Sequence, residues 1–290
     1  MHTILKSAKK DVTIGIDKPF VMIGEKINPT GSKKLAAALR DGDLDYVRQL
    51  AERQVAWGAD VLDVNVGLPN FDEVAAIAKV VELVSSAVDV PICLDSANPA
   101  VLAAGLKAAP GKPLINSVSG EEKRLDSVLP LAKERGAAVI GLTIADGGIP
   151  KTVEERVAVA EKILERAAKI GIPAEDVIID PLVMTVGSDS KAALITLRTI
   201  ELIRKEFGVN INLGASNVSF GLPDRLTINQ TFLAMAIQAG ATCSITDPIK
   251  LGTTIRASDL LIGRDDFAVK FIKYFRNAEA LRAKESQSAG

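Results

Sequence analysis

Acidic and amide side chains recur where short aliphatic runs of this sequence end. Five of them stand within or directly after such a run: Asp63, Asp95, Asn116, Asp180 and Asn217. A polar group among aliphatic residues needs a hydrogen-bonding partner, because burying it alone is costly. A carboxylate accepts two parallel hydrogen bonds from an amidine-like edge, and an amide pairs with both a donor and an acceptor. These residues therefore suit a neutral ligand with several N–H donors in one plane, such as the aminopyrimidinone half of a pterin ring.

Turn formation is the alternative explanation for Asp and Asn at such positions. Helix N-caps and turns favour both residues, which accounts for Asn98 before Pro99 and Asp247 before Pro248. It does not account for so many at once. A metal on these carboxylates would have to be Mg²⁺ or Ca²⁺, since there is no histidine to join them, and we expect no metal site.

The single histidine of the 290 residues, His2, excludes histidine-based chemistry. Ser-His-Asp triads, HExxH zinc sites and imidazole bases all need a histidine held in a site. Lys and Arg total 35 against 36 Asp and Glu, a net charge of −1 with both signs interleaved, so we expect neither nucleic acid nor a membrane as partner. Cys93 and Cys243 lie in apolar runs without metal-site spacing, which favours a reducing cytoplasm.

Short apolar runs alternate with amphipathic stretches along the chain, and the runs predict eight strands. These begin near Val21, Asp60, Val90, Lys112, Ala137, Asp176, Asn210 and Ala241. Several intervening helices end in a glycine just before the next run, as at Gly136 and Gly208. Eight strand–helix units predict an α/β fold, a single-domain (β/α)8 TIM barrel. A doubly wound open sheet is the alternative, but the first strand lacks the GxGxxG signature.

The predicted barrel occupies residues 20–275. Residues 1–19 precede the first strand, and we expect them to cap the bottom of the barrel in a form that the sequence leaves open. Residues 276–290 are polar, and we expect a frayed C-terminal tail. The uncharged stretch from Leu226 to Thr246 carries several polar residues and Gly240, so it predicts a buried helix and a strand rather than a membrane span.

Several motifs resemble those of the pterin-binding barrel methyltransferases in order and spacing. They are Leu62-Asp63-Val64-Asn65, Leu94-Asp95-Ser96, Ile115-Asn116-Ser117, Ile179-Asp180-Pro181 and Ala215-Ser216-Asn217-Val218. The chain closely resembles the methyltetrahydrofolate:corrinoid/iron-sulfur protein methyltransferases, from about Val21 to Phe275. The resemblance implies that the chain moves the N5 methyl group of 5-methyltetrahydrofolate to or from the cobalt of a corrinoid carried by a partner protein. It also implies a homodimer.

Residue roles follow from the resemblance where the motifs match. It implies that the amide of Asn217 reaches N5 of the folate and that Asp180 meets the aminopyrimidinone edge. We assign catalysis to Asn217 and Asp63, and substrate binding to Asp95, Asn116, Asp180, Asn65, Ser216 and Arg225. A surface salt bridge is the alternative role for Arg225. Phe220 stands where relatives have a polar residue, so that contact with the ligand is in question.

Two other functions compete with methyl transfer. Dihydropteroate synthase shares the pterin-binding residues, but its departing diphosphate needs cations, and the only obvious late candidate is Arg256. The other alternative is a non-catalytic folate-binding or corrinoid-docking module. Methyl transfer explains the missing histidine, because cobalt(I) is the nucleophile and the chain has only to place the folate and support a proton at N5.

Overall fold

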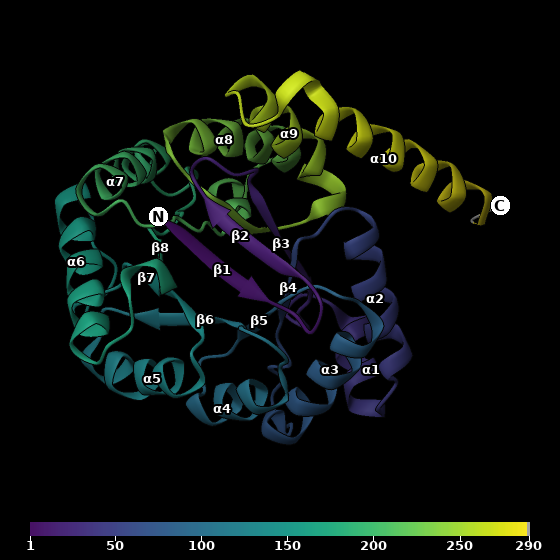
Figure 1. Ribbon diagram of the computed structural model, residues 1–290, viewed down its shortest axis with the longest axis horizontal. Coiled ribbons are helices and arrows are strands. Elements are labelled where there is room, and N and C mark those ends of the chain that lie inside the picture. The colour runs from purple at the N-terminus through teal and green to yellow at the C-terminus, as the bar shows by residue number, and fades with distance from the viewer. Residues whose placement is uncertain (289–290) are drawn as a thin grey trace.

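A computed structural model describes residues 1–288 and has an α/β fold built on a curled, parallel, seven-stranded sheet (Figure 1). The order of the strands in the sheet is β8-β7-β6-β5-β4-β3-β9. Their bounds are β3 Val21–Ile27, β4 Val61–Val64, β5 Ile92–Asp95, β6 Leu114–Ser119, β7 Ala138–Leu142, β8 Val177–Asp180 and β9 Cys243–Thr246. Most of the residues in these strands are buried, as expected of strands packed on both faces. The sheet is consistent with a TIM-barrel-like fold.

The segment at 210–214, where we predicted a strand, joins the two edges of the sheet without forming a regular strand. Ile211 makes an isolated parallel bridge to Ile179 of β8, and Gly214 makes one to Ile245 of β9. The N–H of Ile211 bonds to the Thr242 hydroxyl at 2.9 Å rather than to a strand carbonyl. This side-chain bond interrupts the regular ladder.

Helices follow the strands and surround the sheet in the ring seen in Figure 1. Their bounds are α1 Lys33–Asp41, α2 Leu44–Ala56, α3 Glu73–Ala87, α4 Pro99–Ala108, α5 Glu122–Arg135, α6 Val153–Lys169, α7 Ala192–Phe207, α8 Arg225–Ala239, α9 Pro248–Leu261 and α10 Val269–Ser288. Short 3-10 turns are η1 Ala174–Asp176, η2 Ala215–Ser219 and η3 Asp266–Ala268. The stretch from Leu226 to Thr246 supplies α8 and β9, as predicted.

Local sequence sets several helix ends. The side chains of Asn98 and Asp247 cap the first turns of α4 and α9, so the N-cap explanation is right for these two residues. Gly136 and Gly208 end α5 and α7 in the left-handed conformation, which glycine adopts without steric cost.

Residues 1–19 contain an antiparallel hairpin of β1, His2–Lys6, and β2, Asp11–Gly15, which lies across the ring in Figure 1. Leu5, Val12 and Ile14 of the hairpin are buried in one cluster with the first residues of several sheet strands, including Val21, Val61, Leu114, Ala138 and Cys243. The hairpin therefore packs against the end of the sheet at which the strands begin, which leaves the opposite end open to ligands.

The expected frayed tail is wrong for residues 276–288, which belong to the long helix α10 (Figure 1). Glu285 accepts bonds from the Arg53 guanidinium at 2.8 and 3.1 Å and from the Trp57 indole at 3.2 Å. Asn277 bonds to the carbonyl of Ala56 at 2.9 Å. These contacts with α2, more than 200 residues away in sequence, stabilise a segment whose polar composition alone predicts fraying. Residues 289–290 of the predicted tail lie outside the described residues.

None of the helices in residues 1–288 is both long and apolar enough to cross a membrane.

Candidate active site

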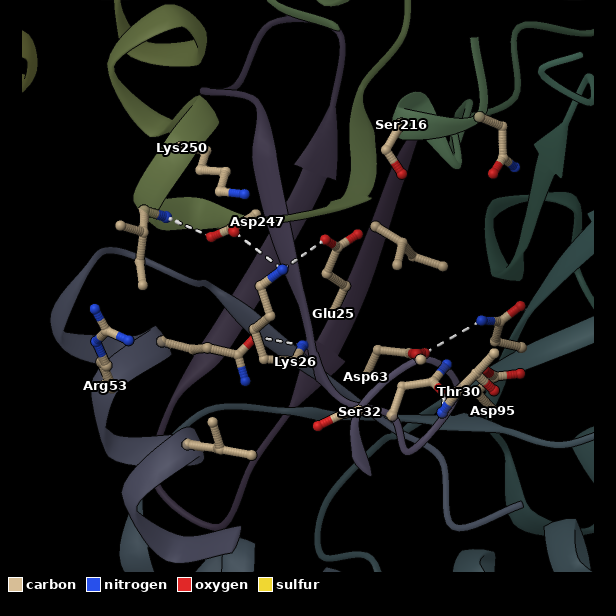
Figure 2. Close-up of a pocket in the computed structure, with 18 of the residues that line it drawn as sticks. Glu25, Lys26, Thr30, Ser32, Arg53, Asp63, Asp95, Ser216, Asp247 and Lys250 are labelled. Atoms are coloured by element: carbon tan, nitrogen blue, oxygen red, sulfur yellow. Dashed lines mark hydrogen bonds and ion pairs between the residues drawn. The ribbon is translucent and has the colours of Figure 1, made fainter. Parts of the chain in front are cut away.

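A cavity of about 830 Å³ opens at the end of the sheet opposite the hairpin. Its volume lies in the range of pockets that hold a small molecule or cofactor. Of the residues singled out in the sequence, Asp63, Asp95, Asn116, Ser216 and Asn217 line it. Figure 2 shows Asp63 of β4 and Asp95 of β5 on one side of the cavity and Asp247 and Lys250, at the beginning of α9, on the other. The carboxyl ends of the strands thus bring residues far apart in sequence to one site.

Asp63 and Asp95 form the acidic side of the cavity, at the ends of neighbouring strands β4 and β5. The Asn116 amide donates a hydrogen bond to Asp63 Oδ1 at 3.2 Å, and the Asn65 amide donates one to Asp95 Oδ2 at 2.9 Å. Asn65 lines a neighbouring cavity rather than the main one. Its position makes it a support for Asp95.

The two carboxyl groups hold protons more tightly than ordinary aspartates. Asp63 is 2% exposed, and burial, with the negative charge of Asp95 added, raises its pKa to about 8. Burial also raises the pKa of Asp95, although the bond from Asn65 opposes this. Asp63 is therefore mostly protonated at neutral pH and is able to donate a proton as well as accept one.

Asp180, at the end of β8, is buried in the protein and does not line the main cavity. Its Oδ2 accepts a bond from the Asn212 amide at 2.8 Å, and its Oδ1 accepts one from the N–H of Leu182 at 2.9 Å. Burial raises the pKa of Asp180 to about 6. Contact between Asp180 and the ligand stays a prediction.

Ser216 and Asn217 reach the cavity from η2, directly after the segment that joins the sheet edges. A Cβ atom on Gly214 would lie 3.2 Å from the Asn217 amide nitrogen, so glycine there leaves room for this amide. Arg225, the first residue of α8, bonds to the carbonyl of Ser216 at 2.8 Å and to the Ser219 hydroxyl at 3.1 Å. Arg225 thus holds η2 in place and lines a smaller cavity beside the main one.

A charged triad that we did not select from the sequence stands on the other side of the cavity (Figure 2). Lys26 Nζ lies 3.0 Å from Glu25 Oε1 and 3.0 Å from Asp247 Oδ2. Although burial opposes the charged form, these two carboxylates raise the pKa of Lys26. The signal was available, because Glu25 and Asp247 directly follow the first and last apolar runs, which become neighbours only when the sheet curls.

Residues from helices complete the site, and no sequence motif marks them. Gln54 of α2 is buried, accepts a bond from the N–H of Lys26 at 2.8 Å, and lines the cavity. Arg53 and Lys250 also line it, so the site contains more cationic groups than the clustered Asp and Asn residues indicate. Across residues 1–288, His, Cys, Asp and Glu side chains do not gather in any group of three that could hold a metal ion.

The sequence matches known proteins over most of its length. Residues 24–247 match the model of a family described as pterin binding enzyme. The chain is 32% identical over 268 residues to the methylcorrinoid:tetrahydrofolate methyltransferase of Eubacterium limosum, which covers 90% of this chain and 97% of that protein. It is also 32% identical over 248 residues to the methionine synthase of Mycobacterium tuberculosis, which covers 81% of this chain but only 21% of that longer protein.

Solved structures of dihydropteroate synthases share the fold. The enzyme of Vibrio fischeri aligns with a TM-score of 0.71 at 19% identity over 91% of this chain and 99% of that one. The enzyme of Yersinia pestis in a sulfonamide drug complex aligns with a TM-score of 0.71 at 17% identity over 91% and 100%. The family match spans more than half of the sequence and includes the cavity residues from Glu25 to Asp247, and the chain therefore belongs to the pterin-binding enzyme family.

Proposed function

We propose that this chain is a methyltransferase that moves the N5 methyl group of 5-methyltetrahydrofolate to or from the cobalt of a corrinoid protein. The observation that carries the proposal is the identity of 32% with a methylcorrinoid:tetrahydrofolate methyltransferase over nearly the whole of both chains. The cavity supports it, because carboxyl and amide groups suited to a pterin edge line the same space as Asn217.

The pterin ring binds through Asp95, Asn116 and Asp180 in this proposal. The first two line the cavity, and Asn65 orients Asp95. Asp180, at the end of β8, does not line the main cavity, and both of its carboxylate oxygens are bonded within the protein. Small movements of Leu182 or Asn212 on folate binding would free one of these oxygens for the aminopyrimidinone edge. Ser216 and Arg225 complete the binding residues from the side of η2.

Proton supply to N5 is the contribution of the chain to catalysis. The electron pair of cobalt(I) forms the new carbon–cobalt bond, the pair of the broken C–N bond stays on N5, and N5 gains a proton. Asn217 places its amide at N5, and protonated Asp63, whose carboxyl group Asn116 orients, feeds the proton to N5 through water. The nucleophile is a substrate on the partner protein, so no nucleophilic side chain is required.

The architecture that we propose is a complete (β/α)8 barrel in a single domain. The segment at 210–214 takes the place of the strand between β8 and β9, supported by its bridges to both. We further propose a cytoplasmic homodimer. The exposed apolar side chains of Leu261, Phe267 and Val269, where α9 leads into α10, offer a surface for a second copy, and light scattering on the purified protein tests the dimer.

Dihydropteroate synthase remains the second candidate only through the shared fold. Arg256, the cation considered for a diphosphate, bonds to the carbonyl of Phe20 at 2.9 Å and pairs with Asp60 at 3.2 Å. These partners place it at the end of the sheet where β3 begins, away from the main cavity.

A spectral assay separates the candidates. The protein mixed with 5-methyltetrahydrofolate and cob(I)alamin should produce the methylcobalamin spectrum, with omission of the protein as the control. Folate binding without any transfer to cob(I)alamin or to a corrinoid protein would identify a binding module instead, and formation of dihydropteroate from its pterin diphosphate and p-aminobenzoate would identify the synthase.

A further inference from the structure

A second cavity of about 260 Å³ opens beside the main one, between the beginnings of α8 and α9. The two cavities share Glu25, Lys26, Ser216, Asp247 and Lys250, so a ligand that fills the first can extend into the second. The methyl-transfer proposal counts Ser216 and Arg225, which line this space, among the binding residues, but it does not say which part of the folate they contact.

Two cations of the second cavity have no carboxylate partner among residues 1–288. Glu25 and Asp247 both pair with Lys26, whereas none of the ion pairs in that part of the chain includes Lys250 or Arg225. The bonds of Arg225 go to the carbonyl of Ser216 and the hydroxyl of Ser219, and its guanidinium lies 5.9 Å from the centre of the Phe220 ring. With three cations and two carboxylates on its wall, the cavity has a positive balance.

The backbone adds to this positive character. Arg225 is the first residue of α8, and Lys250 lies in the first turn of α9. The N-cap residue of α8 makes no side-chain hydrogen bond to its helix, so the unpaired N–H groups and partial positive charge of this N-terminus favour an anion, whereas Asp247 already caps the first turn of α9.

A buried hydroxyl also indicates a missing ligand. Thr246 lines the cavity and is 0% exposed, yet its Oγ1 has no hydrogen-bond partner in the described structure. Buried polar atoms normally have a partner. Leu226 and Leu251 add apolar wall beside it, so the space suits a group that is partly apolar and ends in an anion.

We propose that the second cavity binds the benzoyl-glutamate tail of the folate, with Lys250 and Arg225 holding its carboxylates and Leu226 and Leu251 contacting the benzoyl group. This inference rests on the proposed function, because it takes the pterin ring to occupy the main cavity beside Asp63 and Asp95. It makes Lys250 and Arg225 determinants of specificity for substrates that carry glutamate. An inorganic phosphate or diphosphate shares the same anionic chemistry and is the other source to be tested.

Binding measurements with ligands of different tail length test the proposal. The ligands are a tetrahydropterin without a tail, tetrahydropteroate, and tetrahydrofolate with one or three glutamates. Wild-type affinity should rise from the first ligand to the last. Lys250→Gln should weaken the glutamate-bearing ligands on the order of tenfold, as expected for loss of a charge-assisted hydrogen bond, and should leave the tetrahydropterin unchanged.

Three controls make the outcome decisive. Lys250→Arg should restore most of the affinity, and Lys107→Gln, which removes the same charge from the last turn of α4, should change nothing. Arg225→Gln should repeat the tail-specific loss, but it also loosens η2, so Lys250 is the sharper test. Circular dichroism confirms that each variant folds.

The failures can be told apart. If the tail-less pterin does not bind wild-type protein at all, the proposed function is overturned together with the tail site. If the pterin binds and tail length has no effect, or if Lys250→Gln weakens all ligands equally, only the tail site is overturned. If inorganic diphosphate binds the wild-type protein, Lys250→Gln weakens that binding, and tail length has no effect on folate affinity, the cavity is a diphosphate site instead.

Discussion

The side-chain amide of Asn116 donates a hydrogen bond to the carboxylate of Asp63 at 3.2 Å, and this bond joins β6 to β4 across β5. The strand between them contributes Asp95, which Asn65 holds from β4's carboxyl end. The four residues therefore form one network over three adjacent strands. A protonated carboxyl group that an amide holds in place in such a network can donate its proton toward a ligand, which is the basis of the first prediction.

Replacing Asp63 with asparagine should slow methyl transfer far more than it weakens folate binding. The amide oxygen of the new side chain can still accept the bond from Asn116, so the network keeps its shape but loses the proton. Loss of a general acid should cost roughly 10²–10⁴ in rate. Single-turnover kinetics and equilibrium binding measure the two effects separately, and an unchanged rate would remove Asp63 from the proton path.

The same carboxyl group should make transfer from methyltetrahydrofolate sensitive to pH. Burial raises the pKa of Asp63 to about 8, so the protonated donor disappears as the pH rises through that value and the rate should fall. The Asp63→Asn variant should lack this alkaline limb. A wild-type profile that stays flat through pH 8, with the corrinoid shown to be reduced throughout, would contradict the assignment.

Stability should follow the same titration. The folded state holds the proton of Asp63 with a pKa of about 8 against an ordinary value of 3.8. Its contribution to the free energy of unfolding is therefore fully present below pH 3.8 and is lost as the pH rises toward 8. Urea unfolding across this range should show that Asp63→Asn gains stability relative to wild type as the pH rises, and a constant difference would indicate an unshifted carboxyl group.

Replacing Asn217 with alanine should lower the rate of transfer by roughly 10²–10³ while changing the folate dissociation constant little, as for loss of one preorganised donor at the reacting atom. Gly214→Ala is a matched perturbation, because its new methyl group would lie 3.2 Å from the Asn217 amide nitrogen and would displace that amide without removing it. It should give a smaller loss of rate. Equal losses of rate and affinity in Asn217→Ala would show that the residue only binds.

Asp180→Asn should chiefly weaken folate binding, on the order of tenfold or more, because an amide whose oxygen stays on the N–H of Leu182 presents an NH2 donor, in place of an acceptor oxygen, to the N–H donors of the pterin edge. Its fold should be kept, since the new amide oxygen can still accept the bond from the N–H of Leu182. Asn212→Ala serves as the control for the buried partner alone. If isothermal titration shows an unchanged dissociation constant for Asp180→Asn, Asp180 is structural and does not contact the ring.

Lys26→Met should destabilise the protein by about 1–2 kcal/mol, since it leaves Glu25 and Asp247 without their shared cation. The lysine side chain is 36% exposed, so solvent screens part of the effect. The double variant Lys26→Met with Glu25→Gln should recover some stability by removing one of the stranded charges. A thermal unfolding midpoint unaffected by Lys26→Met would show that the triad contributes nothing measurable.

The sequence predicted residues that line the cavity where those residues stand at the ends of strands. Asp63, Asp95 and Asn116 meet in one cavity because parallel strands present their carboxyl ends at the same edge. Alternating runs and glycine signals likewise predict the strands of the sheet and the ends of helices such as α5 and α7.

Long-range contacts explain what the sequence did not show. The Lys26–Asp247 pair depends on the meeting of β3 and β9, more than 200 residues apart. Gln54 projects from a helix with no local signal of its role. The polar end of α10 is helical because Glu285 contacts Arg53 and Trp57, and composition carries no information about such a partner.

The most direct test of methyl transfer follows the methyl carbon itself. Wild-type protein is mixed with tetrahydrofolate bearing a ¹³C-labelled N5 methyl group and with a cobalt(I) corrinoid, and the label is observed by NMR. The proposed function predicts that the label moves from nitrogen to cobalt with uptake of one proton for each methyl group transferred, and that Asn217→Ala slows this movement. A label that stays on N5 while the folate is bound would contradict it.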